Sequence, residues 1–298
     1  MKQPPVRPLD SAYLTELLTG AGRDPDALTT VTELADGTYN TVYLLKRADG
    51  DLVLKLAPTG PGLTHEHDLI RTEAMFYQAA LGKAPVPEVV ASGPEFLLMT
   101  ALPGVTLNSV ATDRAPYQRE LGAIIASLHE VVGTEGFGYP QLSLKDSWSK
   151  AFLGMFDDVL ADADRYDVTL PDRVSRQLVT DRIALLDSVA VPTLVHFDIW
   201  DGNILVDDGR VTGLIDGERA FWGDPVAEFA SLSLFGDLDP DLLSGYGADV
   251  DRERLALYRV YLYLIMLVEG TPRGYTGPDR AALVKLVERH LAKDLAAL

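Results

Sequence analysis

Hydrophobic and polar residues alternate in short runs near the N-terminus, and this period of two predicts a β-sheet. Residues 41–46 and 51–56 are strand-like, and the Ala-Asp-Gly turn between them is typical of a hairpin. Alternation in the second run places Leu52 and the leucines two and four positions later on one face. Lys55 then projects from the opposite face, which makes it a candidate for a chemical role.

After this hairpin the hydrophobic period changes to that of a helix. Ile70 and Tyr77 share one helical face, and the pattern predicts a helix from about Thr64 to Leu81. Glu73 borders this face because it lies three residues after Ile70 and four before Tyr77. Acidic side chains usually face solvent, so Glu73 is either a surface residue or one with a charged partner.

The rest of the chain predicts one more buried strand followed mainly by helices. The strand covers residues 96–100, and Pro103-Gly104 breaks the pattern directly after it. We therefore expect an α+β fold with two lobes, a small β-rich lobe over residues 1–102 and a larger, mostly helical lobe over residues 103–298. The helices expected in the second lobe begin after Pro116 and cover residues 148–163, 173–189, 252–268 and 279–295.

Composition and charge exclude several classes of function. The 298 residues carry 44 acidic and 26 basic side chains, for a formal net charge of −18. Nucleic acids and anionic membranes bind clustered Lys and Arg, so neither partner is expected. The chain has no cysteine, which excludes disulfides and thiolate chemistry. Its longest apolar run, residues 260–268, suits a core helix rather than a membrane span, so we expect a soluble cytoplasmic protein.

Candidate chemistry is concentrated between positions 194 and 216. His196, Asp198 and Asn203 follow a predicted strand, and two hydrophobic runs flank a hairpin turn after them. Folding back about that turn brings Asn203 and Asp216 to the same end, with Asp198 on the preceding loop. Two carboxylates and an amide supply oxygen ligands, which suit Mg²⁺ better than zinc.

The pattern His196-x-Asp198-x-x-x-x-Asn203, followed by an aspartate after a short hairpin, resembles the catalytic segment of aminoglycoside phosphotransferases. Related small-molecule kinases, such as the choline, homoserine and fructosamine kinases, belong to the same group. The resemblance implies a protein-kinase-like fold and Mg²⁺-dependent phosphoryl transfer from ATP or GTP to a hydroxyl of a small molecule. The expected partners are a nucleoside triphosphate and a hydroxyl acceptor, and the chain is expected to be a monomer or a homodimer.

The resemblance also implies roles for individual residues. Asp198 would accept or orient the proton of the acceptor hydroxyl, while Asn203 and Asp216 would hold Mg²⁺ against the nucleotide phosphates. Lys55 would reach the α- and β-phosphates, and Glu73 would pair with Lys55 to fix its position. That pairing would explain an acid at the edge of a buried stripe.

Two further loops are implied to contact the nucleotide. Gly37, Thr38 and Asn40 lie between two strands, where the family has a short phosphate-covering loop. A plain β-turn is the competing interpretation of this single glycine. Backbone groups of Thr100 and Leu102 would bind the purine at a hinge between the lobes.

Three residues near the motif need separate interpretation. His196 is expected to support its loop rather than bind metal. Gly217 follows the metal-binding aspartate where many relatives have an aromatic residue, so this loop is expected to be more mobile. Glu228 stands where an aspartate is usual, in the helix after Gly223-Asp224-Pro225, a turn expected to be structural.

Other polar and aromatic clusters have two interpretations each. His65-Glu66-His67 opens the first predicted helix and is either a solvated first turn or, less favoured, a metal site. The aspartates between positions 157 and 167 are interpreted mostly as a solvated face. The tryptophans are either stacking surfaces for an acceptor or core residues, and they are Trp148, Trp200 and Trp222.

The acceptor is not defined by these patterns. The favoured hypothesis is a kinase of an aminoglycoside-like or other antibiotic, and the alternative is a metabolic kinase of an amino sugar, amino alcohol or sugar. A nucleotide-binding pseudokinase or regulatory module is disfavoured, because a degenerate module typically loses one of the functional positions that are all present here. P-loop and G-x-G-x-x-G patterns are missing from the sequence, which argues against other nucleotide sites.

Overall fold

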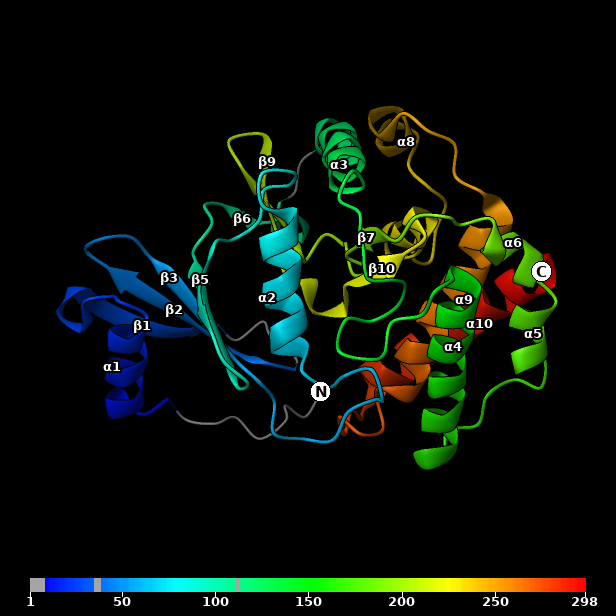
Figure 1. Ribbon diagram of the computed structural model, residues 1–298, viewed down its shortest axis with the longest axis horizontal. Helices are drawn as coiled ribbons and strands as arrows, with labels where there is room; N and C mark the ends of the chain where they lie inside the picture. The colour runs from blue at the N-terminus through cyan, green and yellow to red at the C-terminus, as the bar shows by residue number, and fades with distance from the viewer. Residues whose placement is uncertain (1–8, 35–38, 111–112) are drawn as a thin grey trace.

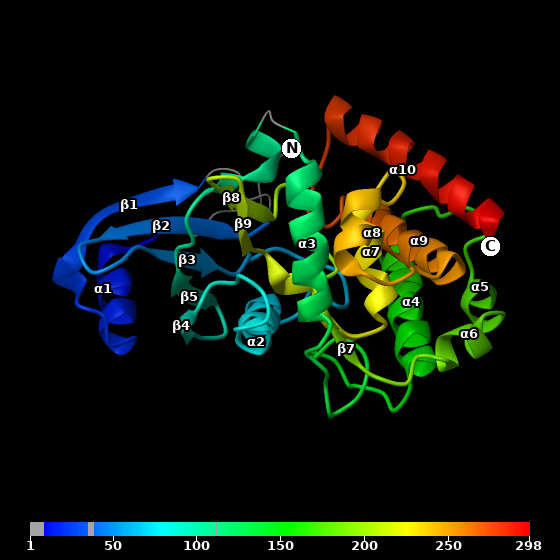
Figure 2. The ribbon, with the colours of Figure 1, turned by 90° about the horizontal axis from the view of Figure 1, so that it is seen from above.

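The computed structural model describes residues 9–34, 39–110 and 113–298, and these form two lobes (Figure 1). A β-sheet accompanied by two helices lies at one end of the molecule, and the longer helices are packed together at the other. A view from above shows the same division (Figure 2). The predicted two-lobed α+β architecture is confirmed.

Five strands form the sheet of the smaller lobe: β1 (Leu28–Leu34), β2 (Thr41–Arg47), β3 (Leu52–Leu56), β4 (Val89–Ser92) and β5 (Phe96–Thr100). They are antiparallel and lie in the order β1-β2-β3-β5-β4. Lys55 of β3 lies opposite Val42 on one side and Leu97 on the other. The predicted hairpin is therefore present, and its lysine stands on the central strand.

The two faces of this sheet bury different side chains. The leucines of β3 pack with Leu14, Leu17 and Leu18 of helix α1 (Ser11–Gly20). Lys55 projects from the opposite face toward helix α2 (Leu69–Ala80), where it pairs with Glu73. The period-two alternation of β3 thus separates a dry face from the face that carries polar chemistry.

Helix α2 begins five residues later than predicted. Residues 64–68 form a turn and a bend, and Asp68 has a left-handed backbone with φ of 51°, which is incompatible with a helix that runs through it. Ile70 and Tyr77 are buried as the stripe predicts. Glu73 is 1% exposed, so it is a buried acid with a partner and not a surface residue.

The segment before α2 crosses to the larger lobe and is buried there. The N–H and hydroxyl of Thr64 donate to the two carboxylate oxygens of Asp162 at 2.6 and 2.8 Å. The His65 ring stacks on Tyr139 with 5.0 Å between ring centroids, and Glu66 forms a buried ion pair with an arginine of the larger lobe. The predicted solvated first turn is therefore wrong for His65 and Glu66, although His67 is exposed, and a solvated position is also wrong for Asp162, which is buried.

Helices make up most of the larger lobe: α3 (Ala115–Leu128), α4 (Trp148–Arg165), α5 (Arg176–Thr180), α6 (Ile183–Asp187), α7 (Phe229–Leu232), α8 (Pro240–Tyr246), α9 (Arg252–Val268) and α10 (Pro278–Ala297). The single helix predicted over residues 173–189 is wrong. Two short helices replace it, because Arg182 departs from helical geometry with φ of −115° and ψ of 15°.

Short strands complete the larger lobe: β6 (Val105–Thr106), β7 (Thr193–Val195), β8 (Ile204–Asp207), β9 (Arg210–Leu214) and β10 (Phe221–Gly223). They form two small sheets, β6-β8-β9 and β7-β10. Strand β6 follows β5 in the chain but pairs with β8, so the chain leaves the first sheet between residues 100 and 105.

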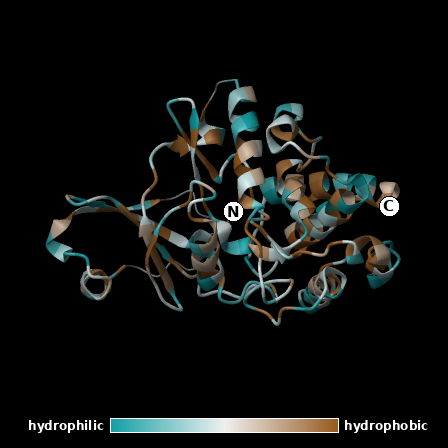
Figure 3. Cartoon of the chain, turned by 45° about the horizontal axis from the view of Figure 1, so that its top comes forward, coloured by the Kyte–Doolittle hydropathy of each residue, from teal (hydrophilic) through white to brown (hydrophobic). Residues whose placement is uncertain are grey.

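Hydrophobic residues gather where the helices pack against one another (Figure 3). Helix α9 lies in this core, and the apolar run that was predicted to be a core helix is part of it. In the described ranges, no helix has the length and apolar character needed to cross a membrane.

The aromatic residues of the core decide between the two interpretations of the tryptophans. Trp148 has no exposed surface, stacks on Phe221 with 5.5 Å between ring centroids, and donates its Nε1–H to the Tyr258 hydroxyl at 2.7 Å. Trp222 also packs against the core. Trp148 is therefore a packing residue, whereas Trp200 is 48% exposed and remains available to a ligand.

The buried His65 ring predicts acid-sensitive stability. Burial lowers the pKa of His65 from 6.5 to about 4, with Arg219 and Arg273 adding to the effect and Glu66 and Asp162 opposing it. The unfolded chain binds this proton near pH 6.5, whereas the folded chain binds it only near pH 4. His65 thus contributes stability that is fully present above pH 6.5 and is lost as the pH falls toward 4.

Replacing His65 with Phe keeps a ring on Tyr139 and removes the titrating group. Urea unfolding at pH 7 and pH 4.5 should show that the wild-type protein loses about 2 kcal/mol more free energy of unfolding than His65→Phe over this interval. Equal losses of unfolding free energy in the two proteins would contradict a lowered pKa of His65, because the other titrating groups are common to both.

Candidate active site

The hairpin of β8 and β9 brings two distant segments together. Its turn residues, Asp208 and Gly209, have φ values of 44° and 76°, which suit a two-residue hairpin turn. The N–H of Ile215 donates to the carbonyl of Asn203 at 3.0 Å. Asn203 and Asp216 therefore lie at the same end of the hairpin, as the sequence predicts.

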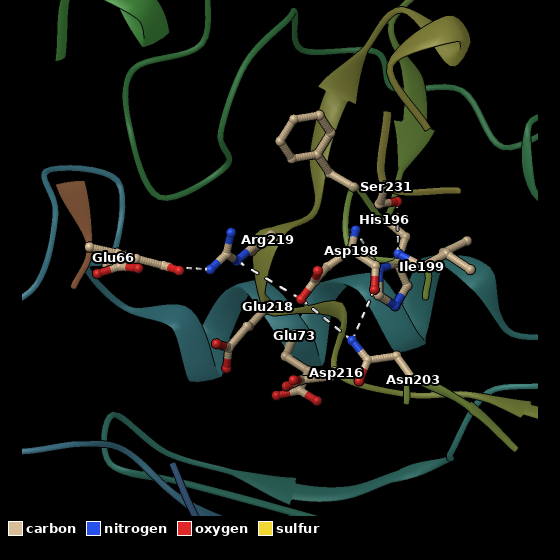
Figure 4. Close-up of polar contacts among 12 residues, drawn as sticks. Glu66, Glu73, His196, Asp198, Ile199, Asn203, Asp216, Glu218, Arg219 and Ser231 are labelled. Atoms are coloured by element: carbon tan, nitrogen blue, oxygen red, sulfur yellow. Dashed lines mark hydrogen bonds and ion pairs between the residues drawn. The ribbon is translucent and has the colours of Figure 1, made fainter. Parts of the chain in front are cut away.

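Asp198 lies beside this end, on the loop between β7 and β8, with 25% of its side chain exposed. The amide Nδ2 of Asn203 donates to the Asp198 carbonyl at 2.9 Å and to its carboxylate at 3.4 Å. Burial raises the pKa of Asp198 to about 7, against the opposing effect of the nearby Arg219 guanidinium. Figure 4 shows Asp198 between Arg219 and Asn203, and a carboxyl with such a pKa is suited to accept and return a proton.

The backbone of this loop is strained and is fixed by hydrogen bonds to buried side chains. Phe197 has φ of 66°, and a left-handed non-glycine residue costs about 1–3 kcal/mol. The buried Glu228 carboxylate accepts the N–H groups of His196 and Phe197 at 2.8 and 2.9 Å. His196 in turn accepts the Asp198 N–H at Nδ1 and donates from Nε2 to the Ile215 carbonyl. His196 therefore has the supporting contacts that were expected of it.

Three carboxylates surround the ammonium group of Lys55. Its Nζ lies 2.6 Å from Glu73, 2.5 Å from Asp216 and 2.8 Å from Glu218. Burial alone would lower the pKa of Lys55, but the carboxylates raise it well above its usual value. The predicted pairing of Lys55 with Glu73 is present, and Glu218 is an additional partner.

This cluster has more negative than positive charge. Glu73, Asp216 and Glu218 place carboxylate oxygens within 4.8 Å of one another around one ammonium group, and burial raises the pKa of Glu73 to about 7 against the effect of Lys55. A divalent cation would complete the balance, and oxygen ligands suit Mg²⁺. The residues present therefore fit the metal that the resemblance implies. Within the described ranges no such group includes His65 or His67, so the alternative metal site there has no support.

Glu218 and Arg219 were not identified from the sequence. They lie two and three residues after Asp216, and this closeness to a predicted metal ligand is the one signal in the sequence that could have identified them. Asn40 Nδ2 donates to Glu218 at 2.5 Å, so one residue of the predicted phosphate-covering loop reaches the cluster. Gly37 and Thr38 lie outside the described residues.

Comparison with protein families places this site in a known context. The model of a family described as "Phosphotransferase enzyme family" matches residues 30–258, which include the five-stranded sheet except its first two residues, α2 and the whole β8–β9 hairpin. The chain belongs to the phosphotransferase enzyme family. The family predicted from the motif is therefore confirmed.

Individual curated proteins match this chain at lower similarity. Acyl-CoA dehydrogenase family member 11 of Mus musculus is 26% identical over 252 residues, which cover 75% of this chain and 30% of that protein. Hygromycin-B 4-O-kinase of Escherichia coli is 25% identical over 222 residues, which cover 70% of this chain and 62% of the kinase. The chain spans less than two thirds of the length of either relative.

A solved structure has the same fold as this chain. It is a thermostable variant of aminoglycoside phosphotransferase APH(4)-Ia in a ternary complex with AMP-PNP and hygromycin B. The TM-score is 0.66 at 18% identity, and the alignment covers 95% of this chain and 97% of that chain. The expected protein-kinase-like fold is confirmed.

The segment expected to bind a purine in this family fold is partly committed to the sheet. The Thr100 N–H donates to the Glu88 carbonyl at 3.0 Å, and the Thr100 hydroxyl accepts the Glu88 N–H at 2.9 Å. A purine contact at Thr100 would therefore use its carbonyl group. Leu102 is half-buried, and its side chain lies over Gly213 of β9.

Gly217 packs tightly, contrary to the mobility expected from its lack of a side chain. A Cβ at Gly217 would lie 2.4 Å from the ring of Phe76 in α2. The neighbouring Asp216 has φ of 65°, and its N–H donates to the Tyr77 hydroxyl at 3.0 Å. The glycine thus allows this loop to approach α2 closely enough for Asp216 to reach Lys55.

Replacing Gly217 with Ala should destabilise the protein, because the added methyl group must displace a buried ring. We expect a loss of about 1–3 kcal/mol in the free energy of unfolding, measured by urea denaturation. Gly154→Ala is the matched control, since a Cβ at that helical position meets no atom within 4 Å. That variant should gain up to about 1 kcal/mol, and a Gly217→Ala protein as stable as Gly154→Ala would refute the packing argument.

Proposed function

We propose that the protein is a small-molecule kinase that transfers the γ-phosphoryl group of ATP or GTP to a hydroxyl group. The observation that carries this proposal is the convergence of Asp198, Asn203, Asp216 and Lys55 at one end of the β8–β9 hairpin. A carboxylate near neutral pKa, an amide and a fixed lysine are the groups that phosphoryl transfer uses. Membership of the phosphotransferase enzyme family supports the same chemistry.

In this proposal, Lys55 binds the α- and β-phosphates and Glu73 keeps it in place from α2. Asp216 and Asn203 hold Mg²⁺, and Glu218 supplies a third carboxylate beside them. The metal, when bound, neutralises phosphate charge that develops during transfer. Asp216 therefore has two functions, because it holds Lys55 by a direct ion pair and offers oxygen ligands on the same side.

Asp198 would orient the acceptor hydroxyl and receive its proton. A quarter of its side chain is exposed, so a hydroxyl group can reach it, whereas its backbone is fixed by Asn203 and His196. This combination of an accessible carboxylate and a rigid loop holds the base in one position relative to the acceptor.

The nucleotide would lie between the lobes, which we propose to divide at residues 1–102 and 103–298. Strand β5 belongs to the first sheet and β6 pairs with β8, so the connection between them can act as a hinge. The carbonyl of Thr100 and the backbone of Leu102 would bind the purine there. Gly37, Thr38 and Asn40 would cover the phosphates.

The acceptor is proposed to be a hydroxylated small molecule such as an aminoglycoside-like antibiotic, an amino sugar or an amino alcohol. One relative is named hygromycin-B 4-O-kinase, and Trp200 offers an exposed ring two residues after Asp198. Aromatic rings of this kind stack on sugars and cations. A coupled assay across these compounds, with ATP and with GTP, identifies the acceptor and the nucleotide.

Replacing Asp198 with Asn should lower kcat about 10²–10⁴-fold on any acceptor found, because the amide cannot take the proton. Nucleotide binding, measured by calorimetry, should stay within about threefold of wild type, since Lys55 and Asp216 are unchanged. Asp207→Asn, on the exposed turn side of the same hairpin, is the control and should keep full activity. Full activity in Asp198→Asn would rule out the proposed base.

A further inference from the structure

A chain of alternating charges runs away from Asp198 to the opposite edge of the site. Nε of Arg219 lies 3.9 Å from Oδ2 of Asp198, and Nη2 of Arg219 lies 2.7 Å from Oε2 of Glu269. Nη1 of Arg273 lies 3.0 Å from the same Glu269 oxygen, and Nη2 of Arg273 pairs closely with Glu66. These five side chains are between 75% and 98% buried.

Arg219 is held from the side remote from Asp198. Among the described residues, Arg219 is the one basic residue with a nitrogen within 4.0 Å of the Asp198 carboxylate. The 3.9 Å between its Nε and Oδ2 of Asp198 is nevertheless longer than a hydrogen bond. Its short contact is with Glu269 instead. The distance between the guanidinium and the candidate base is therefore set by the position of Glu269.

Glu269 in turn depends on Arg273. It caps the C-terminus of α9, where the helix dipole disfavours a carboxylate, and its side chain is only 12% exposed. Burial would raise the pKa of Glu269, but Arg273 and then Arg219 hold it below its usual value. Arg273 lies one turn further along the chain and shares the Glu269 oxygen with Arg219, so it helps to keep this carboxylate ionised and in place beside Arg219.

Arg273 also contacts the smaller lobe on its other side. Its guanidinium lies 4.0 Å from the centroid of the Tyr39 ring, within the range of a cation–π contact. Tyr39 directly precedes Asn40, which bonds to Glu218 of the carboxylate cluster. Glu66, the ion-pair partner of Arg273, belongs to the segment that crosses between the lobes. One side chain thus contacts elements from both lobes.

We propose that Arg273 is a positioning residue for phosphoryl transfer, acting on Asp198 through Glu269 and Arg219. Without Arg273, two buried carboxylates lose their common cation. Glu269 then keeps Arg219 as its nearest cation, so Arg219 is drawn further from Asp198. Asp198 would lose part of the neighbouring positive charge that favours its ionised, proton-accepting form. The expected effect on phosphoryl transfer rests on the proposed function, whereas the expected movement of Arg219 does not.

The kinetic test compares Arg273→Met with Arg273→Lys, which keeps the charge. We expect Arg273→Met to lower kcat at least about tenfold while the nucleotide KM changes less than threefold, and Arg273→Lys to recover most of the loss. Adding Glu269→Gln to Arg273→Met should lower kcat by no more than a further twofold, because both act through one path. Independent, multiplying effects would overturn the proposal.

The matched control is Arg259→Met, which breaks another buried Arg–Asp pair, 2.6 Å long, between α9 and α10. It should lower the melting temperature as Arg273→Met does, but leave kcat within twofold of wild type. A kcat loss in Arg259→Met equal to that in Arg273→Met would reduce Arg273 to a purely structural role and refute the proposal.

A measurement without turnover separates this proposal from the proposed function. The Nε–H signal of Arg219 in ¹⁵N spectra of the full chain should shift in Arg273→Met and stay in place in Arg259→Met. An unchanged signal in Arg273→Met would refute the positioning role even if the enzyme is active. A shifted signal with no transfer by the wild-type protein to any acceptor would support the positioning role and defeat the proposed function.

Discussion

The site depends on one buried ammonium group, the Nζ of Lys55, and the three carboxylates that share it. These groups come from the central strand of the sheet, from α2 and from the segment after β9, so their ion pairs join three elements that are distant in sequence. Removing the lysine would leave two buried carboxylates, Glu73 and Glu218, and the half-buried Asp216 without this cation, which is strongly unfavourable. The cluster therefore aligns the sheet, α2 and the β8–β9 hairpin, and its excess negative charge would favour binding of a divalent cation.

A second constraint acts through the backbone. Phe197 and Asp216 both adopt left-handed conformations, and each is held by contacts behind the site: Glu228 for the first and the Tyr77 hydroxyl for the second. Strain of this kind persists only where the surroundings over-determine it. The two loops that carry the candidate base and a candidate metal ligand are therefore fixed by hydrogen bonds, while the side chain of Asp198 itself remains accessible.

Local patterns predicted the elements, and the motif predicted the fold and family. Period-two alternation placed Lys55 correctly, and helical periodicity matched α9. What the sequence could not show was long-range pairing: Glu66 looked like a solvated helix start because its partner, Arg273, lies far along the chain. Glu218 was missed for the same reason. The net charge of −18 likewise does not predict the charge of the site. The charge of the site depends on which acidic side chains form ion pairs with Arg219, Arg273 and Lys55.

The most direct test of this account is the metal dependence of nucleotide binding. A cluster of three carboxylates and one ammonium group, exposed at Asp216, should repel a bare triphosphate and accept it together with a divalent cation. Calorimetric titration of ATP and GTP, with Mg²⁺ and with a chelator, should therefore show at least about tenfold tighter binding of the preferred nucleotide when Mg²⁺ is present. Equal affinity with and without Mg²⁺ would contradict the central claim that this cluster is a phosphate and metal site.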